Sequence, residues 1–155
     1  MAKPNNNKNN KKPNDYFTNN IKQRGEGFIQ TKSPQELQRD SINIIRQIAR
    51  GNIDLHANAQ YFLDNTLLTN MIVAVNAKRA IETIKRDGVS MLYTSQLQNP
   101  AIYDVDTTSA VLQNQILLVQ AYTIATEILE ALYQSQNPAW LYTLASQLSD
   151  YKYII

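Results

Sequence analysis

The chain has 155 residues but no cysteine, and only one histidine and four glycines. Without cysteine it can form neither disulfides nor thiolate metal sites. Gly25, Gly27, Gly51 and Gly88 are too scattered to build a phosphate loop or a dinucleotide-binding turn. The longest apolar run, "MIVAV" at 71–75, is far shorter than the roughly 20 residues of a membrane-spanning helix. We therefore expect no membrane segment.

Charged side chains also offer little chemistry. His56 has no serine or cysteine partner in a known catalytic arrangement, so a surface or helix-cap role is the simpler interpretation. The two carboxylates of "DVD" at 104–106 lack the rest of a calcium loop. Glu127 and Glu130 are not followed by the Glu-x-x-His motif of a di-iron bundle. We expect no catalytic residue, no cofactor and no metal site, and hence a protein that is not an enzyme.

Charge is distributed unevenly along the chain although its net value is only +2. Residues 1–32 hold seven Lys or Arg against two acids, a balance of +5. Residues 33–90 hold seven against six, and residues 91–155 hold one against five. A basic first part and an acidic last part favour contact between the first part and an anionic surface. That surface could be nucleic acid, an acidic protein, or the acidic end of a sister subunit.

Residues 1–32 are predicted to form an extended or disordered arm, because they are rich in Asn and Lys and poor in apolar residues. They also lack the apolar core of a signal peptide, so we expect a virion or cytoplasmic protein that is not secreted. The large apolar residues of this arm are candidate anchors on a partner: Tyr16, Phe17, Ile21, Phe28 and Ile29. Its cations are candidate contacts to an anionic surface: Lys3, Lys8, Lys11, Lys12, Lys22, Arg24 and Lys32.

A helical domain is predicted over residues 33–150. "SPQE" at 33–36 combines a Ser cap, a Pro in the first turn and a Glu three residues after the cap, which together mark a helix start. Gly51 is suited to the left-handed residue that ends this helix. The next segments are predicted as a helix over 54–87 stopped by Gly88, and then a short helix or turn over 89–98. An extended stretch over 101–106 follows. Two further helices are predicted, one from Asp106 or Thr107 to about Gln134 and one from an Asn137 cap to Ser149.

Two apolar stripes at coiled-coil spacing predict that the two long helices pack against each other in antiparallel orientation. The first stripe is Leu63, Leu67, Asn70, Ala74, Ala77, Ile81 and Ile84. The second is Ala110, Asn114, Leu117, Ala121, Ile124, Ile128 and Ala131. Each stripe contains one asparagine, which either fixes the register inside the seam or faces water. Further apolar residues lie outside both stripes, so part of this surface is expected to be covered by other copies or other proteins.

The basic cluster "KRAIETIKR" at 78–86 has two interpretations. Around Glu82 it is typical of a solvated, ion-paired helix face. It could also join the arm as an anion-binding face. If all seven cations of the arm met phosphates, the logarithm of the affinity would fall with the logarithm of the salt concentration at a slope of about −6. No recognition helix is visible, so nucleic-acid binding would be independent of base sequence.

The general plan resembles the small helical structural proteins of tailed-phage virions, such as head–tail connector and adaptor subunits. The features that carry the resemblance are the polar arm at 1–32, the helical body at 33–149 and the apolar tail "YKYII" at 151–155. The resemblance implies a non-catalytic subunit that docks on neighbouring virion proteins or on its own copies. It also implies that Tyr151, Tyr153, Ile154 and Ile155 form a second contact. The alternative function is a nucleic-acid-associated accessory protein with a basic tether.

Overall fold

The computed structural model describes residues 33–55, 65–102, 104–134 and 138–155. These residues form four α-helices and no strand: α2 (Pro34–Ala49), α3 (Asn65–Leu97), α4 (Val105–Tyr133) and α5 (Pro138–Ser149). The all-α prediction is confirmed. The described part of the chain has four helices rather than about five, and the predicted arm at residues 1–32 lies outside it.

The start of α2 follows the predicted capping pattern. The Ser33 hydroxyl accepts a hydrogen bond from the Glu36 backbone N–H at 3.2 Å, and Pro34 is the first helical residue. The Ser33 hydroxyl also donates to the Glu36 carboxylate at 3.4 Å. At the other end Gly51 has a φ of 75°, the left-handed conformation that glycine adopts without steric cost. Local chemistry therefore sets both ends of this helix.

Helix α3 ends ten residues later than predicted, at Leu97 rather than Asp87. It runs without a break through Gly88, which was expected to stop it, and so joins the predicted helix over 54–87 to the predicted segment over 89–98. Asp54 and Leu55 lie before it in non-helical backbone. An interior glycine costs a helix only about 1 kcal/mol relative to alanine. Packing along α4 compensates for a cost of that size.

The connection from α3 to α4 is a turn rather than an extended stretch. The Ile102 N–H donates to the Asn99 carbonyl at 3.1 Å, and α4 begins at Val105. Its cap is Asp104, whose carboxylate accepts from the Thr107 N–H at 3.1 Å, so the predicted cap at Asp106 or Thr107 is two or three residues too late. Helix α5 begins at Pro138 and ends at Ser149, as predicted; the predicted cap Asn137 lies outside the described residues.

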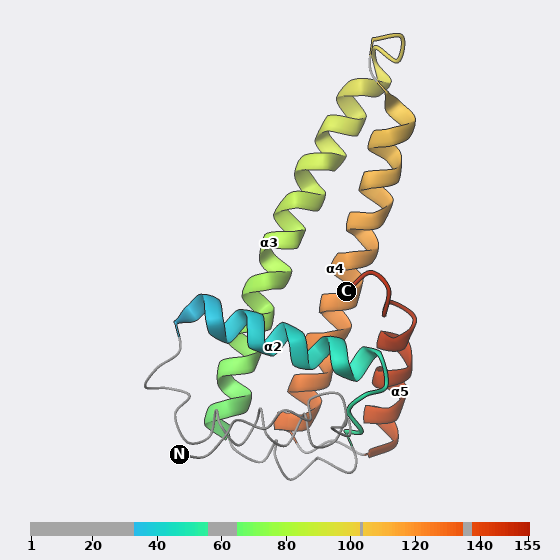
Figure 1. Cartoon of the computed structure of the whole chain (residues 1–155). Coiled ribbons are helices and arrows are strands. Elements are labelled where there is room, and N and C mark those ends of the chain that lie inside the picture. Colours follow the sequence, from blue (N-terminus) through green and yellow to red (C-terminus); the bar gives the residue numbers. More distant parts are fainter. Residues whose placement is uncertain (1–32, 56–64, 103, 135–137) are drawn as a thin grey trace, which may run out of the picture.

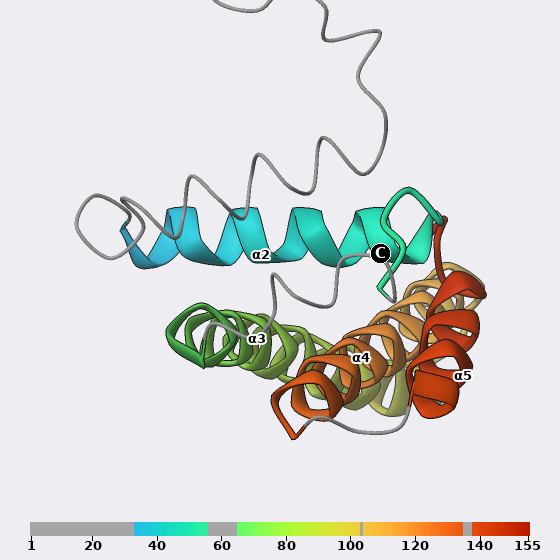
Figure 2. The same ribbon diagram turned by 90° about the horizontal axis from the view of Figure 1, so that it is seen from below.

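The four helices form a two-helix hairpin with a broader packed end (Figure 1). Helices α3 and α4 lie side by side in antiparallel orientation and make the most extensive helix–helix contact, which confirms the predicted pairing. Helix α2 crosses them near the end of the hairpin opposite the turn, and α5 lies beside α4 (Figure 1). Seen along the hairpin, α2 forms one layer and α3, α4 and α5 form the second (Figure 2). The turn at residues 98–102 stands far from both α2 and α5 (Figure 1).

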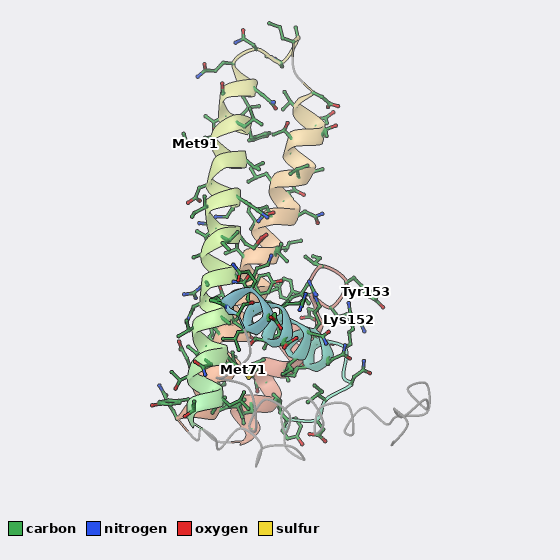
Figure 3. The ribbon with its side chains drawn as sticks, turned by 60° about the vertical axis from the view of Figure 1, so that its left-hand side comes forward. Met71, Met91, Lys152 and Tyr153 are labelled. Carbon is green, nitrogen blue, oxygen red and sulfur yellow. The ribbon has the colours of Figure 1, made fainter. Side chains whose placement is uncertain are left out.

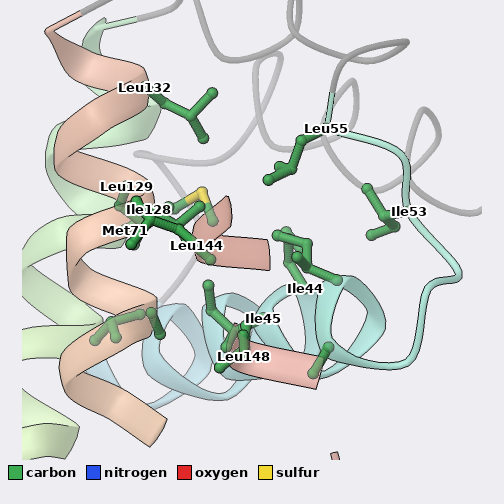
Figure 4. Close-up of a cluster of buried hydrophobic side chains, with 14 of the residues drawn as sticks. Ile44, Ile45, Ile53, Leu55, Met71, Ile128, Leu129, Leu132, Leu144 and Leu148 are labelled. Carbon is green, nitrogen blue, oxygen red and sulfur yellow. The ribbon is translucent and has the colours of Figure 1, made fainter. Parts of the chain in front are cut away.

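The hydrophobic core lies where α2, α5 and one half of the hairpin meet (Figure 4). Its fully buried members come from all four helices, and the largest are Tyr122, Ile44, Ile45, Leu68, Met71, Ile128, Leu129, Leu144, Leu148 and Val75. On α3 the last buried apolar residue is Val75, and on α4 the first is Val119. We call this packed part the base: α2, α5, α3 up to Val75 and α4 from Val119.

Candidate interaction surface on the distal hairpin

The rest of the hairpin, residues 76–118, projects beyond the base, and we call it the distal hairpin (Figure 1). Two helices alone can shield one seam from water, but they leave their outer faces exposed. Among its described residues only two are buried, Glu82 and Gln96, and both are polar. The described part of the distal hairpin therefore has no buried apolar side chain of its own.

Glu82 is 3% exposed and forms a polar contact between the two helices. The Gln115 side-chain amide on α4 donates to the Glu82 backbone carbonyl at 2.9 Å and to its carboxylate Oε1 at 3.4 Å. The ammonium groups of Lys78 and Lys85 lie 3.9 Å and 3.6 Å from the carboxylate oxygens. Two cations and a neutral donor thus surround the buried charge, which reduces the cost of its burial, while Glu82 Oε2 accepts no hydrogen bond among the described residues.

Polar contacts between α3 and α4 do not involve the two stripe asparagines. Asn114 is exposed, in agreement with the alternative that it faces water, and Asn70 is half-buried. Glu82 and Gln115 form one of these contacts, and the Arg79 guanidinium adds a bond to the Thr126 hydroxyl at 3.5 Å. The interpretation of "KRAIETIKR" is right about ion pairing and wrong about solvation of Glu82. The sequence signal that could have predicted this buried ion pair is Glu82 with Lys78 four residues before it and Lys85 three residues after it.

The predicted stripe on the first long helix is right in the base, where Leu67 and Ala74 are buried, and wrong in the distal hairpin. Ile81 and Ile84, its last two members, are 43% and 72% exposed. The residues turned toward α4 in the distal hairpin follow another line, with Glu82, Val89 and Gln96 all less exposed than their outer neighbours. On α4 the predicted members Ala110 and Leu117 are likewise exposed, whereas Ala121, Ile128 and Ala131 are buried in the base.

Large apolar side chains are exposed along the whole distal hairpin. Those at 37% exposure or more are Ile81, Ile84, Met91, Leu92, Leu97, Ile102, Val111, Ile116 and Leu117. Figure 3 shows Met91 far from the base, on the side of α3 that faces away from α4. Single exposed apolar residues are ordinary on protein surfaces, but a continuous series along one projecting element marks an interaction site.

Charge is almost absent from the part of the distal hairpin that lies beyond Asp87. The sequence has no charged residue from Gly88 to Tyr103, and none from Thr107 to Thr126. Asp104 and Asp106 are the exceptions between these segments, and bonds from the Thr107 side chain and backbone lower the pKa of Asp104. Exposed helix faces in monomeric proteins are normally rich in charge. The distal hairpin beyond Asp87 is therefore a weakly charged rod whose composition suits contact with another macromolecule.

The predicted arm contacts lie outside the described residues: Tyr16, Phe17, Ile21, Phe28, Ile29, Lys3, Lys8, Lys11, Lys12, Lys22, Arg24 and Lys32. His56 and Leu63 lie outside them as well. The predicted C-terminal contact is described, and it is divided between two environments. Ile155 belongs to the core, and its backbone oxygen accepts from Arg46 Nε at 2.6 Å. Tyr151 packs against the core and donates to Gln120 at 3.1 Å, whereas Tyr153 is 91% exposed beside Lys152 (Figure 3).

The base contains a deeply buried titratable group with a shifted pKa, the Tyr122 phenol. Its side chain is 1% exposed, and burial raises its pKa above the ordinary value of 10.0. The Arg46 charge and a hydrogen bond from Arg46 oppose this rise, and the charge of Glu82 adds to it. Arg46 thus links α2 to α4 and to the last residue of the chain. This arrangement is structural, because Tyr122 is closed off from any substrate.

Two further observations bear on the kind of site. No group of three or more His, Cys, Asp or Glu residues in the described ranges is arranged to hold a metal ion. One described helix, α4, is long and apolar enough to cross a membrane by length and composition, and half of its apolar window is buried against the rest of the chain. A buried core helix passes the same test, so this finding does not separate a membrane contact from a protein contact.

Comparison of the chain with protein-family models, with curated proteins and with solved structures finds no match.

Proposed function

We propose that this chain is a non-catalytic structural subunit of a larger protein assembly, in which the distal hairpin docks between neighbouring subunits. The observation that carries the proposal is the distal hairpin itself. It projects from a well-packed base, exposes apolar side chains over its length, and buries only Glu82 and Gln96 among its described residues. A free rod of this kind leaves apolar surface in water, and burying that surface in an assembly is favourable.

The setting we propose is a phage virion, where the subunit would occupy a head–tail connector or a similar place. The support for this finer statement is the sequence plan: a polar basic arm, a helical body and an apolar tail. In a ring or shell the arm and the distal hairpin would make different contacts. Apolar residues of the arm, such as Phe17 and Phe28, would lie on a neighbour, while the hairpin packs into the ring.

The test introduces two negatively charged residues into the distal hairpin by mutating the gene in its native genome. Met91 and Ile102 are 73% and 75% exposed, so replacing both by Glu leaves the core untouched. The matched control, Gln35→Glu with Gln147→Glu, adds the same charges at exposed positions of the base. We expect the control chain to sediment with its assembly. The Met91→Glu, Ile102→Glu chain should accumulate as a 17.7-kDa monomer with an unchanged unfolding temperature.

Two results would count against the proposal. One is a native chain that sediments as a monomer in the cells that make it. The other is a hairpin variant that assembles normally while removal of residues 1–32 abolishes a salt-sensitive association with DNA or RNA. That second result would support the alternative prediction of a nucleic-acid-associated accessory protein.

A further inference from the structure

The face of α3 that points away from α4 carries a regular series of apolar and small residues, which we call the outer stripe. Its members are Val73, Ala77, Ala80, Ile84, Gly88, Met91 and Ser95. All seven are exposed, and the three largest, Val73, Ile84 and Met91, are 63%, 72% and 73% exposed. None of the described residues covers this face of the helix.

The spacing of the outer stripe is that of a packing seam. Steps of four, three and four residues lead from Val73 to Ile84, and the same steps lead from Ile84 to Ser95. An 11-residue repeat stays close to the 3.6-residue period of an α-helix, so all seven residues lie within about 40° of one line along α3. A second helix can therefore contact the whole stripe without supercoiling strongly.

The spacing of the outer stripe is symmetric about Ile84. In an antiparallel pair of α3 helices centred on this residue, Ala77 would face Met91 of the second copy and Ala80 would face Gly88. Val73 would face Ser95. Each of these contacts joins a small residue to a larger one or to another small one, so the two backbones can approach evenly. A parallel pair would instead place Met91 against Met91 and Gly88 against Gly88, which leaves alternating bulges and gaps.

Gly88 leaves room for a close neighbour at the outer stripe. It lies inside a continuous helix without a positive φ, and a side chain added to it would meet nothing within 4 Å. Glycine lowers helix stability relative to alanine, and the described part of the fold gives no steric reason for it here. Close approach of another backbone is one physical reason for a glycine in such a place.

Charge on this face is compatible with pairing to an identical face. From Thr66 to Leu97, the part of α3 within about 80° of the centre line of the outer stripe has one charged residue, Asp87. The Arg86 guanidinium lies 3.1 Å from the Asp87 carboxylate and offsets its charge. Two copies of this face can meet without like-charge repulsion, whereas a charged partner would find almost nothing to pair with.

The size of the contact indicates its strength. Residues 73–95 span about 33 Å along a helix that is roughly 10 Å wide, a footprint of about 330 Å² per copy. A stable dimer usually buries about 800 Å² per partner. The outer stripe alone is thus a weak contact, as expected for one of several interfaces within an assembly. Its detection requires covalent cross-linking, because a measurement of solution mass would miss a weak dimer.

We infer that the outer stripe of α3 binds the outer stripe of a second copy of this chain, antiparallel, with the twofold axis at Ile84. This inference deepens the proposed function by naming one partner of the distal hairpin, and it rests on that function for its biological setting. In a twofold contact each residue meets its symmetry mate only near the axis. Ile84 is the residue that meets itself.

The test uses the absence of cysteine from the natural sequence. In the full chain, Ile84→Cys gives a single thiol at the axis, and a disulfide forms only when two Cα atoms come within about 7 Å. We expect Ile84→Cys to give a covalent dimer under mild oxidation at least tenfold faster than Val73→Cys, whose copies would lie about 33 Å apart. A mixture of Ala80→Cys and Gly88→Cys chains should also cross-link, and faster than either chain alone.

A matched pair of substitutions tests whether packing at the outer stripe is required. Gly88→Leu and Ser90→Leu each add a good helix former at an exposed position of α3, so neither should unfold the chain. Gly88 is on the outer stripe and Ser90 is about 120° away from its centre. In the Ile84→Cys background we expect Gly88→Leu to reduce the cross-linking rate at least tenfold and Ser90→Leu to leave it within about twofold.

Other occupants of the outer stripe would give different results, and each would overturn the inference. If Val73→Cys links as fast as Ile84→Cys, the pairing is parallel or random. If the thiol of the Ile84→Cys chain is protected from maleimide at every protein concentration and removal of residues 1–32 exposes it, the arm of the same chain covers the stripe. If no variant cross-links while the Met91→Glu, Ile102→Glu chain still loses its assembly, another protein covers the stripe and the proposed function stands without this inference.

Discussion

The base and the distal hairpin share the helices α3 and α4, yet α3 buries opposite kinds of side chain in the two regions. In the base, α3 contributes Met71 and Val75 to the core, both 0% exposed. In the distal hairpin the same helix buries only Glu82 and Gln96 among the described residues. The difference follows from the neighbours, because α2 and α5 cover one half of the hairpin and not the other. Sequence hydrophobicity alone does not make a core.

Energetics separate the two regions further. Full burial of an Ile, Leu or Met side chain contributes roughly 1.5–3 kcal/mol, and the base collects many such contributions. The distal hairpin collects partial burial along one seam and a buried carboxylate, Glu82, whose ion pairs roughly offset its desolvation. We therefore attribute the stability of the isolated chain to the base, with the distal hairpin held in place by continuity of α3 and α4.

The largest contrast is expected between equal truncations in the two regions. Ile45 is 0% exposed in the core, and Ile84 is 72% exposed on the outer stripe. Ile45→Ala should lower the free energy of unfolding by about 2–5 kcal/mol, because it removes buried methyl groups and leaves a cavity. Ile84→Ala should change it by less than about 0.5 kcal/mol. Urea denaturation of the monomer at low protein concentration measures both.

Equal losses at Ile45 and Ile84 would break this comparison. They would mean that the distal hairpin is covered within the monomer and belongs to one cooperative core with the base.

The second contrast concerns two glycines with different backbone conformations, a left-handed one at Gly51 and a helical one at Gly88. Gly51 has a φ of 75°, so Gly51→Ala should lower the free energy of unfolding by about 1 kcal/mol or more, because an L-side chain is strained there. Gly88 is in a helix with open space around its Cα, so Gly88→Ala should raise it by about 0.5–1 kcal/mol. Thermal unfolding of the two variants beside the native chain checks the signs.

If Gly88→Ala lowers the free energy of unfolding at low protein concentration, the outer stripe of α3 is not open in the monomer. That result would show that something within the monomer lies against the helix at this point.

The smallest effect is expected in the pH dependence of the base. In the unfolded chain the Tyr122 phenol loses its proton near pH 10, whereas burial raises its pKa in the folded chain. The folded state therefore holds more protons, and the stability that Tyr122 contributes is present below pH 10 and declines as the pH rises through that value. Tyr122→Phe should show a shallower decline from about pH 9 to about pH 11 than the native chain. Tyr153→Phe, at an exposed position, is the control, and an equally shallow decline there would contradict the assignment.

Local signals in the sequence were enough to predict several features of the fold. The cap formed by Ser33 and Glu36, the turn at Gly51 and the start of α5 at Pro138 depend on neighbouring residues, and all three are confirmed. The antiparallel pairing of the long helices also follows from their length and the short connection between them. Contacts within a few residues are the same in any fold, so such features can be read before the fold is known.

The face of α3 that becomes buried could not be read in the same way. The line through Ile81 and Ile84 and the line through Glu82 and Val89 both have helical spacing, and the more apolar one was the natural choice for the seam. In the distal hairpin the tertiary structure decided otherwise, because α2 packs on α3 within the base and fixes the rotation of α3 that continues into the distal hairpin. The chain's composition thus sets an all-helical body with excess apolar surface, and only the packing of the base decides which surface remains free for a partner.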